Sequence, residues 1–536
     1  MARSVHLRPW QRVALDRLAS SGAHDFLAVA TPGAGKTTFA LAACRQWLGE
    51  APSALVVVVP TAHLKYQWAR AAAALDLHLD AGWSPSRGAL PSDMHGVVTT
   101  YQQVATAPSA IGKVAGAAVV ILDEIHHAGD ERAWGDALVA AFSGARRRLA
   151  LSGTPFRSDT RSIPFIRYVN DEASPDFEYG YGPALAEHRV VRPVYFPRTN
   201  GYMEWSAPDG MLHSATFDEA LDAARANQRL RAALSIEGEW LPEVLRAAHA
   251  RLLQIRAHQP DAGGLVIATD QDHARGIASI IESRLRARAV VATSDDPDAS
   301  AKILRFSTSS DPWLIAVRMV SEGVDIPRLR VGVYATTTTT ELFFRQAVGR
   351  LVRWQAGVGR QAAYLFIPDD RRLRTMAAEI ADDRRHQLRR RDGGGEREEP
   401  LSEEVRSGDD GDEQLSLFSV ISSVATDAVI PTDETDDEPH EEVDDPLLLL
   451  ELPAPPPLHS GGAAGGEAKS RTEVKNELRA KNAAIVRALV AQTGWTHAQV
   501  NGELNRRAGL RRVTEATVRQ LETRLSHGER WFATKR

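Results

Sequence analysis

The sequence predicts an α/β fold with parallel sheets, followed by a disordered acidic linker and a small all-α C-terminal domain. Three observations support this prediction. Apolar runs such as residues 54–59 and 118–122 are typical of strands buried on both faces, and each leads into polar residues and a helical pattern. After about Arg391 the chain turns to Gly, Glu, Asp, Pro and Ser, which cannot bury enough apolar surface to fold. Helical periodicity returns after residue 467.

Length and composition limit the possible classes of protein. A chain of 536 residues should hold two or three domains with sizeable cores. The single cysteine, Cys44, excludes a disulfide scaffold and a Cys-rich metal site and fits a reducing compartment. We see no signal peptide and no apolar run long enough to cross a membrane, so we expect a cytoplasmic protein.

The net charge of −5 hides an uneven distribution. Residues 396–445 contain 19 acidic residues and 2 Arg, whereas residues 467–536 contain 15 Lys or Arg and 7 Glu. A basic segment of this kind is typical of a surface that binds nucleic acid.

A glycine-rich turn at residues 30–38 follows the apolar run 26–29 and precedes a helical pattern at 39–48. A strand, a glycine turn and a helix in this order predict a phosphate-binding loop with Mg²⁺. Lys36 would reach the β- and γ-phosphates, and the Thr37 hydroxyl would bind Mg²⁺. The strict pattern has Gly at position 30, where this chain has Ala. The residues expected to contact the nucleotide here are Thr31, Gly33, Ala34, Gly35, Lys36, Thr37 and Thr38.

Two neighbouring segments complete the predicted nucleotide site. The run 118–122 ends in Asp123 and Glu124, which can hold Mg²⁺ and activate the attacking water. His126 and His127 follow, but no Cys or further His cluster accompanies them to suggest a second metal. Upstream, Trp10 could stack on a base and Gln11 could read the edge of adenine, although an ordinary N-terminal helix explains both equally well.

Further motifs produce a family resemblance. The segments ATPGAGKTT, PTAHLKYQW, VVTTYQQV, DEIHH and SGTPFR, in this order, resemble the DEAD/DEAH-box (DExH) class of superfamily 2 helicases and translocases, in particular the type III restriction-like DNA helicase branch. Residues 264–270, 313–327 and 346–353 resemble the later motifs of the same class. The resemblance covers about residues 8 to 370 and implies two tandem RecA-like parallel-sheet domains.

The resemblance also assigns roles to single residues. The catalytic set it implies is Lys36, Asp123, Glu124, His126, Gln346, Arg350 and Arg353. It adds Gln11, Gly323 and Asp325 as nucleotide contacts, with Thr37 and Asp123 at the metal. Spacings of four and three should place Gln346, Arg350 and Arg353 on one helix face, with both guanidiniums at the γ-phosphate. Candidate contacts to the nucleic-acid backbone are Thr61, Thr100, Thr269 and Ser321.

These patterns give a domain plan with five parts. Residues 1–160 are the ATP-binding domain, 161–258 a largely helical connection, 259–390 the second RecA-like domain, 391–466 the disordered linker, and 467–536 a basic helical domain.

The predicted linker contains one apolar island, formed by Gln414, Leu415, Ser416, Leu417 and Phe418. These residues resemble the bacterial sliding-clamp-binding peptide, in which a polar anchor and spaced apolar side chains dock into a groove. A chance match of five residues is the alternative. Residues 447–450 are a weaker candidate for a second docking patch.

The basic end is expected to form helices. A helix is predicted at 472–491, a capping box at Thr496 opens a second that ends before Gly509, and Thr514 begins a third. With five arginines around the turn, these helices resemble a helix-turn-helix on phosphates, and a protein-docking bundle is the alternative.

The function expected from the sequence is an ATP-dependent DNA helicase or translocase that uses ATP and Mg²⁺. The alternatives are a duplex translocase that never separates strands, an RNA helicase, a restriction or repair nuclease subunit, and a non-catalytic, clamp-recruited DNA-binding scaffold. We find no nuclease constellation of carboxylates and lysine, and the intact Lys36, Glu124 and Arg353 argue against the scaffold.

Overall fold

The computed structural model describes residues 3–87, 90, 93–129, 132–154, 162–170, 172–187, 189–207, 211–293, 295–296, 298–317, 326–359, 361–391, 419–429, 448–456, 471–510, 513 and 516–534. Their contacts divide the chain into two compact units. The first comprises residues 1–29, 35–178 and 446–536, and the second comprises 30–34 and 179–445.

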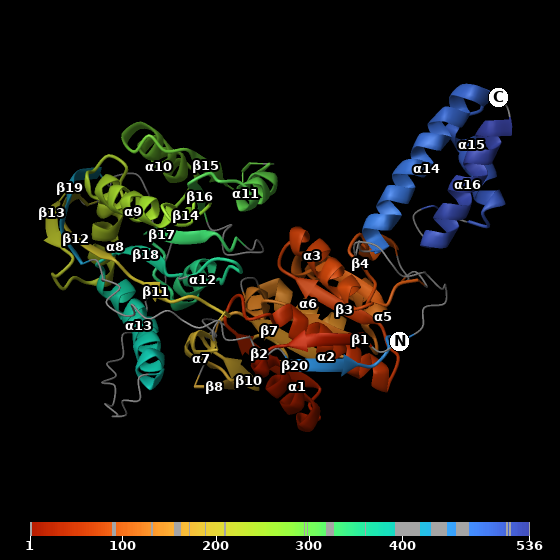
Figure 1. The fold of residues 1–536 in the computed structure, drawn as a ribbon, viewed down its shortest axis with the longest axis horizontal. Helices are drawn as coiled ribbons and strands as arrows, with labels where there is room; N and C mark the ends of the chain where they lie inside the picture. Colours follow the sequence, from red (N-terminus) through yellow and green to blue (C-terminus); the bar gives the residue numbers. More distant parts are fainter. Residues whose placement is uncertain are drawn as a thin grey trace. The chain divides into compact units, whose positions relative to one another are not determined.

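The first unit contains a seven-stranded sheet in the order β10-β2-β7-β6-β3-β5-β4 (Figure 1). Its strands are β2 (Asp25–Ala30), β3 (Leu55–Val59), β4 (Leu79–Asp80), β5 (Gly96–Thr100), β6 (Val119–Leu122), β7 (Arg147–Ser152) and β10 (Phe177–Tyr179). The strand pairs from β2 to β4 are all parallel, so the carboxyl ends of these strands meet at one edge. Every residue of β3, β5 and β6 is buried, as the continuous apolar runs predict.

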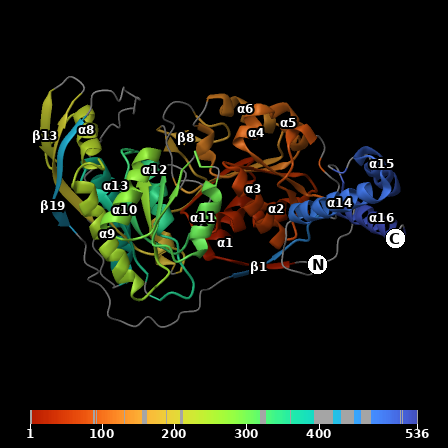
Figure 2. The same ribbon diagram turned by 90° about the horizontal axis from the view of Figure 1, so that it is seen from above.

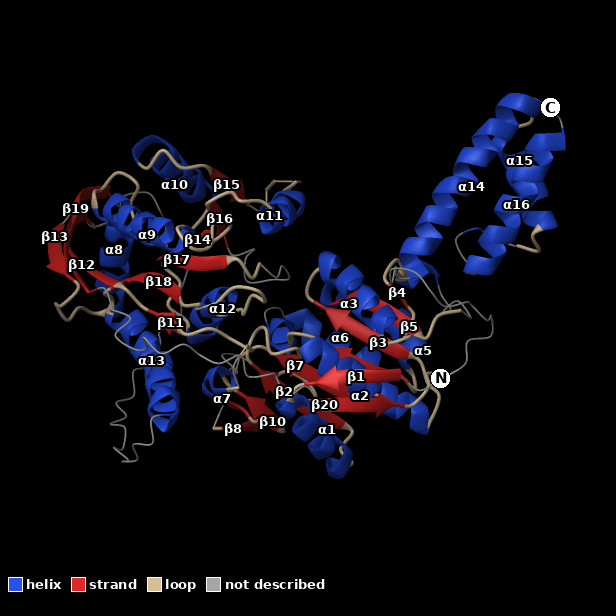
Figure 3. Cartoon of the chain, in the orientation of Figure 1, coloured by secondary structure: helices blue, strands red, loops and turns tan. Residues whose placement is uncertain are grey.

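Helices connect these parallel strands, and Figure 3 shows the alternation. They are α1 (Pro9–Ser21), α2 (Lys36–Glu50), α3 (Ala62–Ala74), α4 (Tyr101–Thr106), α5 (Pro108–Ala115) and α6 (Arg132–Phe142). Short 3₁₀ turns, η1 (Pro85–Arg87) and η2 (Ile125–Gly129), and a small hairpin of β8 (Tyr168–Val169) and β9 (Glu172–Ala173) complete this part of the unit.

The second unit contains a nine-stranded sheet whose main path runs β13-β12-β18-β17-β14-β16-β15. Its strands are β11 (Val194–Tyr195), β12 (Arg198–Ser206), β13 (Leu212–Thr216), β14 (Gly263–Ala268), β15 (Ala289–Ala292), β16 (Trp313–Val317), β17 (Leu329–Ala335), β18 (Ala363–Pro368) and β19 (Ser419–Val429). Its helices are α7 (Tyr181–Ala186), α8 (Ala223–Ala233), α9 (Trp240–Arg256), α10 (Gln271–Arg284), α11 (Ala299–Thr308), α12 (Glu341–Leu351) and α13 (Arg371–Arg391). The two units therefore each have the sheet expected of tandem RecA-like domains.

The connection between the predicted domains is not largely helical. Strands β8 to β13 and the short helix α7 lie in residues 168–216, and the longer helices α8 and α9 follow in the second half. Strand β12 alternates buried and partly exposed residues and pairs with β13, β18 and β19, so this segment extends the second sheet. This alternation with a period of two is the pattern of a half-exposed strand and not of the helix expected in this region.

Two segments of the predicted disordered linker form strands. Strand β19 pairs antiparallel with β12, and β20 (Leu448–Leu452) pairs antiparallel with β1 (Arg3–Leu7). Arg45, which is fully buried, donates to the backbone oxygens of Pro453 and Leu75. The apolar run at 447–450 thus pairs within the chain from Leu448 onward, and the disordered linker expected at 391–466 is corrected at these two segments.

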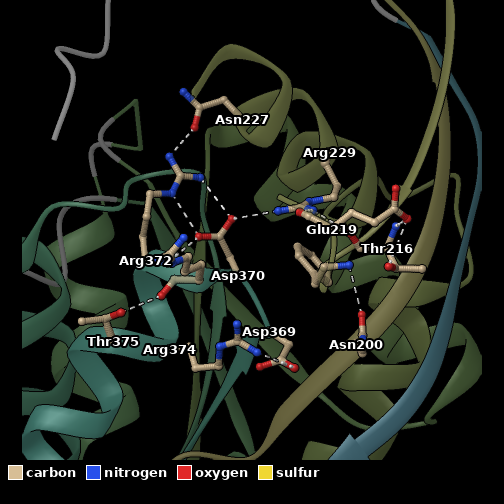
Figure 4. Close-up of polar contacts among 12 residues, drawn as sticks. Asn200, Thr216, Glu219, Asn227, Arg229, Asp369, Asp370, Arg372, Arg374 and Thr375 are labelled. Atoms are coloured by element: carbon tan, nitrogen blue, oxygen red, sulfur yellow. Dashed lines mark hydrogen bonds and ion pairs between the residues drawn. The ribbon is translucent and has the colours of Figure 1, made fainter. Parts of the chain in front are cut away.

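A buried polar network holds the start of α13 against α8 and strand β13 (Figure 4). The carboxylate of Asp370 accepts from Arg372 Nε at 3.0 Å and Nη2 at 3.2 Å, and Arg229 Nη2 lies 4.0 Å away. Arg372 also donates to Asn227, and Arg229 donates to the backbone oxygen of Thr216 at 2.5 Å. Because Asp370 is 1 % exposed, its charge depends on these guanidiniums.

His273 gives the second unit a pH-dependent contact. Its Nδ1 accepts from the Thr269 N–H at 3.2 Å, so the proton lies on Nε2, which donates to the Leu234 oxygen at 2.8 Å. Burial lowers the pKa of His273. As the pH falls through the ordinary histidine range, the unfolded chain therefore binds a proton that the folded chain resists.

We expect the free energy of unfolding of the second unit to fall between pH 7 and pH 5, and His273→Gln to weaken this dependence by up to about one proton. Denaturant titrations at three pH values measure the slope, with exposed His258→Gln as the matched control. If the slope of unfolding free energy against pH is unchanged in His273→Gln, then His273 is not the source of this pH dependence.

The C-terminal helices α14 (Arg471–Thr493), α15 (His497–Arg507) and α16 (Val518–Thr534) form a bundle in which α14 and α16 run side by side (Figures 1 and 2). The predicted capping box at Thr496 is confirmed. The third helix begins later than expected, after Thr517, whose hydroxyl accepts from the Gln520 N–H. Inside the bundle Arg524, 1 % exposed, donates to three asparagine side-chain oxygens, those of Asn482, Asn501 and Asn505.

This bundle contacts the rest of the first unit through a buried ion pair. Lys475 Nζ lies 3.1 Å from Asp93 Oδ1, and the Val518 N–H donates to Asp93 Oδ2. The two side chains are 1 % and 0 % exposed, so separating them would leave a charge buried without its partner. Within the described part of the chain, no helix has both the length and the apolar character needed to span a membrane.

Candidate nucleotide site

The phosphate-binding loop lies between β2 and α2, where the sequence predicts it. Gly33 and Gly35 adopt left-handed conformations, with φ of 84° and 95°. A Cβ on Gly35 would lie 2.7 Å from Nε2 of Gln11, so only glycine fits here. Lys36 is the first residue of α2, and the N-terminus of a helix is a favourable place to bind phosphate.

Gln11 and Trp10 have different surroundings. Gln11 is buried, and its Nε2 donates to the Gly35 oxygen at 2.9 Å, which places its amide against the phosphate-binding loop. Trp10 is 3 % exposed and packs between Phe39 and Phe177, with ring centroids 5.7 and 6.1 Å away. The suggestion that Trp10 stacks on a base is therefore wrong, because its ring belongs to the core of the first unit.

Lys36, Asp123 and Glu124 lie together at the carboxyl edge of the sheet. Lys36 Nζ is 3.2 Å from Glu124 Oε1, and the other Glu124 oxygen accepts from the Gly153 N–H at 2.9 Å. Glu124 has a φ of 48°, a left-handed conformation that is uncommon for a residue with a side chain. Such strained residues concentrate at functional sites, where the surrounding structure holds them in place.

The two adjacent carboxyl groups have opposite pKa shifts. Burial and then the charge of Glu124 raise the pKa of Asp123 to about 6, against the opposing effect of Lys36. Burial also acts to raise the pKa of Glu124, but the charges of Lys36 and His126 and the Gly153 N–H outweigh it and lower this pKa to about 2. A pair whose pKa values are pushed apart is typical of carboxylates with different roles.

His126 connects this site to the end of β7. Its Nδ1 lies 3.0 Å from Ser152 Oγ, and Ser152 Oγ donates its only hydrogen to the Thr154 oxygen at 2.7 Å. The histidine nitrogen must therefore be the donor in its contact with Ser152. The same Nδ1 is 3.7 Å from Glu124, so His126 contacts both the predicted base and the SGT segment. His127 packs its ring against His126 at 4.5 Å.

The residues present fit a nucleotide and Mg²⁺. The described residues contain no group of three His, Cys, Asp or Glu side chains that would form a complete metal cage. Mg²⁺ usually needs no such cage, since one or two protein oxygens, waters and the phosphates hold it. Thr37 and Asp123 are the candidate protein ligands, and Thr31, Ala34 and Thr38 are the remaining described residues of the predicted loop.

The predicted residues of the second unit are only partly brought together. Gln346 and Arg350 lie four residues apart on α12, but the helix ends at Leu351, and Arg353 forms a bridge to Val191. The expectation that all three share one helix face is therefore corrected. After the helix ends, the chain pairs with residues 191–192, where the Arg192 N–H donates to the Val352 oxygen. Ser321, Gly323 and Asp325 lie outside the described residues, as do the five residues of the predicted clamp peptide.

Two residues near the site were missed by the sequence analysis. Trp68 Nε1 donates to Asp123 Oδ2 at 2.7 Å, and the Tyr101 hydroxyl donates to the Asp123 backbone oxygen at 2.9 Å. Burial, followed by the charges of Asp123 and Glu124, raises the pKa of Tyr101 well above its usual value, so its hydroxyl keeps its proton. Trp68 belongs to the segment PTAHLKYQW and Tyr101 to the segment VVTTYQQV. The spacing of residues in these segments does not predict either hydrogen bond to Asp123.

The first unit resembles superfamily 2 helicase-like proteins. Residues 4–157 match the family described as type III restriction enzyme, res subunit. The chain is 46 % identical over 390 residues to the uncharacterized protein ML1624 of Mycobacterium leprae (strain TN), which covers 71 % of this chain and 65 % of the relative. It is also 46 % identical over 392 residues to the uncharacterized protein Rv2917 of Mycobacterium tuberculosis (strain ATCC 25618 / H37Rv), with 72 % and 65 % covered. The chain thus spans slightly less than two thirds of these relatives.

Solved structures show more distant similarity. A fragment described as an HsdR subunit of a type I restriction enzyme from Vibrio vulnificus YJ016 has a TM-score of 0.48 and 17 % identity, over 69 % of this chain and 65 % of that chain. Dbp5 of S. cerevisiae bound to RNA and ADP BeF3 has a TM-score of 0.43 and 14 % identity, over 70 % and 87 %.

Proposed function

We propose that this chain hydrolyses ATP with Mg²⁺ and couples the hydrolysis to movement along DNA, as a helicase or translocase. The observation that carries the proposal is the convergence of Lys36, Asp123 and Glu124 in the first unit. A lysine at a glycine-rich helix start and two carboxylates with separated pKa values are the parts that phosphoryl transfer to water needs.

In this proposal each side chain has a distinct role. Thr37 and Asp123 hold Mg²⁺, which would neutralise phosphate charge, and Lys36 binds the phosphates. Glu124 is ionised at neutral pH and accepts a proton from the attacking water. His126 would couple the site to Ser152, which it already contacts. The roles of Gln346, Arg350 and Arg353 at the γ-phosphate and of Gly323 and Asp325 at the nucleotide stay predictions.

DNA is the proposed substrate for two reasons. The family model that matches residues 4–157 is named for a restriction enzyme subunit, and restriction enzymes act on DNA. The C-terminal helices also present exposed arginines, among them Arg487, Arg506 and Arg519, which would bind the phosphate backbone without reading sequence. Recruitment to a sliding clamp through Gln414, Leu415, Leu417 and Phe418 stays part of the proposal.

The test is the rate of ATP hydrolysis with single-stranded DNA, duplex DNA or RNA added. We expect stimulation by DNA that weakens as salt is raised, because phosphate contacts release counterions. Stimulation by RNA alone would overturn the choice of substrate, and no hydrolysis with any nucleic acid would overturn the motor.

A further inference from the structure

Asp123 is held from two sides by aromatic donors. The Trp68 indole binds one carboxylate oxygen, Oδ2, and the Tyr101 hydroxyl binds the backbone oxygen. Both donors are buried, at 2 % and 1 % exposure. The Glu124 backbone N–H also donates to this carboxylate. The bonds from Trp68 and Tyr101 tie Asp123 to the helices α3 and α4, on which these two donors lie.

The two donors lie on neighbouring helices that begin at the carboxyl edge of the sheet, although Trp68 is in the middle of its helix. Trp68 lies on α3, which begins after Thr61, and Tyr101 is the first residue of α4, directly after Thr100. Strands β3 and β5 pair in parallel, with Val59 opposite Thr100, so the two helices begin side by side. Thr61 and Thr100 are the residues proposed to contact the DNA backbone. The Thr61 hydroxyl makes no capping bond to α3, whereas the Thr100 hydroxyl accepts from the Gln103 N–H.

A buried contact links the two helices. Lys65 on α3 is 7 % exposed, and its ammonium donates to Gln103 Oε1 on α4 at 3.2 Å. The same amide oxygen accepts from the Thr99 hydroxyl and the Thr100 N–H. The same ammonium also donates to the Trp83 backbone oxygen at 3.4 Å, so the contact with Gln103 is one of several that hold Lys65. It links α3 directly to α4.

Resting on the function proposed above, we propose that Trp68 and Tyr101 are positioning residues that transmit nucleic-acid binding at the starts of α3 and α4 to Asp123. A phosphate backbone bound at these helix starts would shift the positions of α3 and α4. The hydrogen bonds from Trp68 and Tyr101 would then shift Asp123, the candidate metal ligand. Coupling of binding free energies is reciprocal, so bound nucleotide must change DNA affinity by the same factor.

The alternative is that both rings only fill space in the core. A buried indole needs some partner for its N–H, but a backbone oxygen would serve, and here the partner is the candidate metal ligand. Replacement by phenylalanine separates the two explanations, because it keeps an aromatic ring and removes the donor.

The experiment measures the affinity of the full-length chain for fluorescein-labelled oligothymidylate by anisotropy, with and without Mg²⁺ and a non-hydrolysable ATP analogue. We expect the analogue to change wild-type affinity by about 5- to 150-fold. Trp68→Phe should bring this ratio close to one, and Tyr101→Phe should reduce it while leaving the ring in place. The controls are Trp47→Phe, a buried tryptophan of the same unit, and Tyr66→Phe, an exposed residue on α3.

The outcomes separate two parts of the proposal, namely the coupling of nucleotide binding to DNA binding and the positioning role of Trp68 and Tyr101. A wild-type ratio that both variants retain overturns the positioning role alone. If the DNA affinity of the wild-type chain does not change when nucleotide binds, the two binding events are not coupled. This result overturns both the coupling and the positioning role of Trp68 and Tyr101. If Trp68→Phe does not fold, Tyr101→Phe decides the question, because it loses a single hydroxyl.

Discussion

Replacement of Glu124 by Gln is expected to lower the kcat of ATP hydrolysis by about 10²- to 10⁴-fold, the usual loss when a general base is removed. The physical reason is the low pKa of about 2, which keeps the Glu124 carboxylate ionised and able to accept a proton. Glutamine keeps an oxygen for the Gly153 N–H, which now donates to Glu124 at 2.9 Å, but glutamine cannot accept a proton from water. Phosphate release measures the loss.

Nucleotide binding should survive this change, since Lys36 and the helix start remain. A fluorescent ATP analogue would show a dissociation constant close to that of the wild type, so the loss would lie in kcat. Glu50→Gln is the matched control, because Glu50 is an exposed glutamate of the same unit at the end of α2. Wild-type turnover by Glu124→Gln would mean that another group activates the water.

Replacement of Asp370 by Ala should destabilise the second unit by about 3–5 kcal/mol, the cost of removing one partner from a buried charge network. Arg229 is 3 % exposed and would lose its nearest carboxylate, and Arg372 would lose three hydrogen bonds, one from its backbone N–H and two from its guanidinium. The start of α13 and the middle of α8 share this network, so both should loosen (Figure 4). Denaturant titration combined with hydrogen exchange of the α8 and α13 amides measures the effect.

The same helix offers a control for this prediction. Asp382 pairs with Arg385 on the surface of α13, with 68 % and 58 % of the two side chains exposed. Asp382→Ala should therefore change the free energy of unfolding by less than about 0.5 kcal/mol. Equal effects of the two substitutions would show that the buried network contributes no more than a surface pair.

The parts of the site that the sequence predicts are those in which a buried strand ends in a functional residue. A run such as residues 118–122 must be a central strand, and the edge where Asp123 and Glu124 follow it is set by the parallel order of the sheet. Lys36 is equally predictable, because the glycines before it adopt the conformations that the loop requires. Local sequence and sheet topology are sufficient in these cases.

The remaining features depend on contacts between distant residues. Burial of Trp10 depends on Phe177, and the departure of Arg353 from the helix depends on Val191. Strands β19 and β20 lie in acid-rich sequence whose composition argues against folding, and each forms only by pairing with a strand far away in the chain. A contact of this kind leaves no periodic pattern in the segment itself, so composition and spacing cannot predict it.

The pairing of β1 with β20 also affects how the chain folds while it is being synthesised. Arg3 and its partner, Leu452, are about 450 residues apart in the sequence, so β1 leaves the ribosome long before β20. At about 5–20 residues per second, β1 would wait on the order of a minute with its edge uncovered. Unpaired strand edges invite association with other chains, so β1 would be exposed to aggregation until β20 is made, and a chaperone that shields β1 during this interval would raise the folding yield.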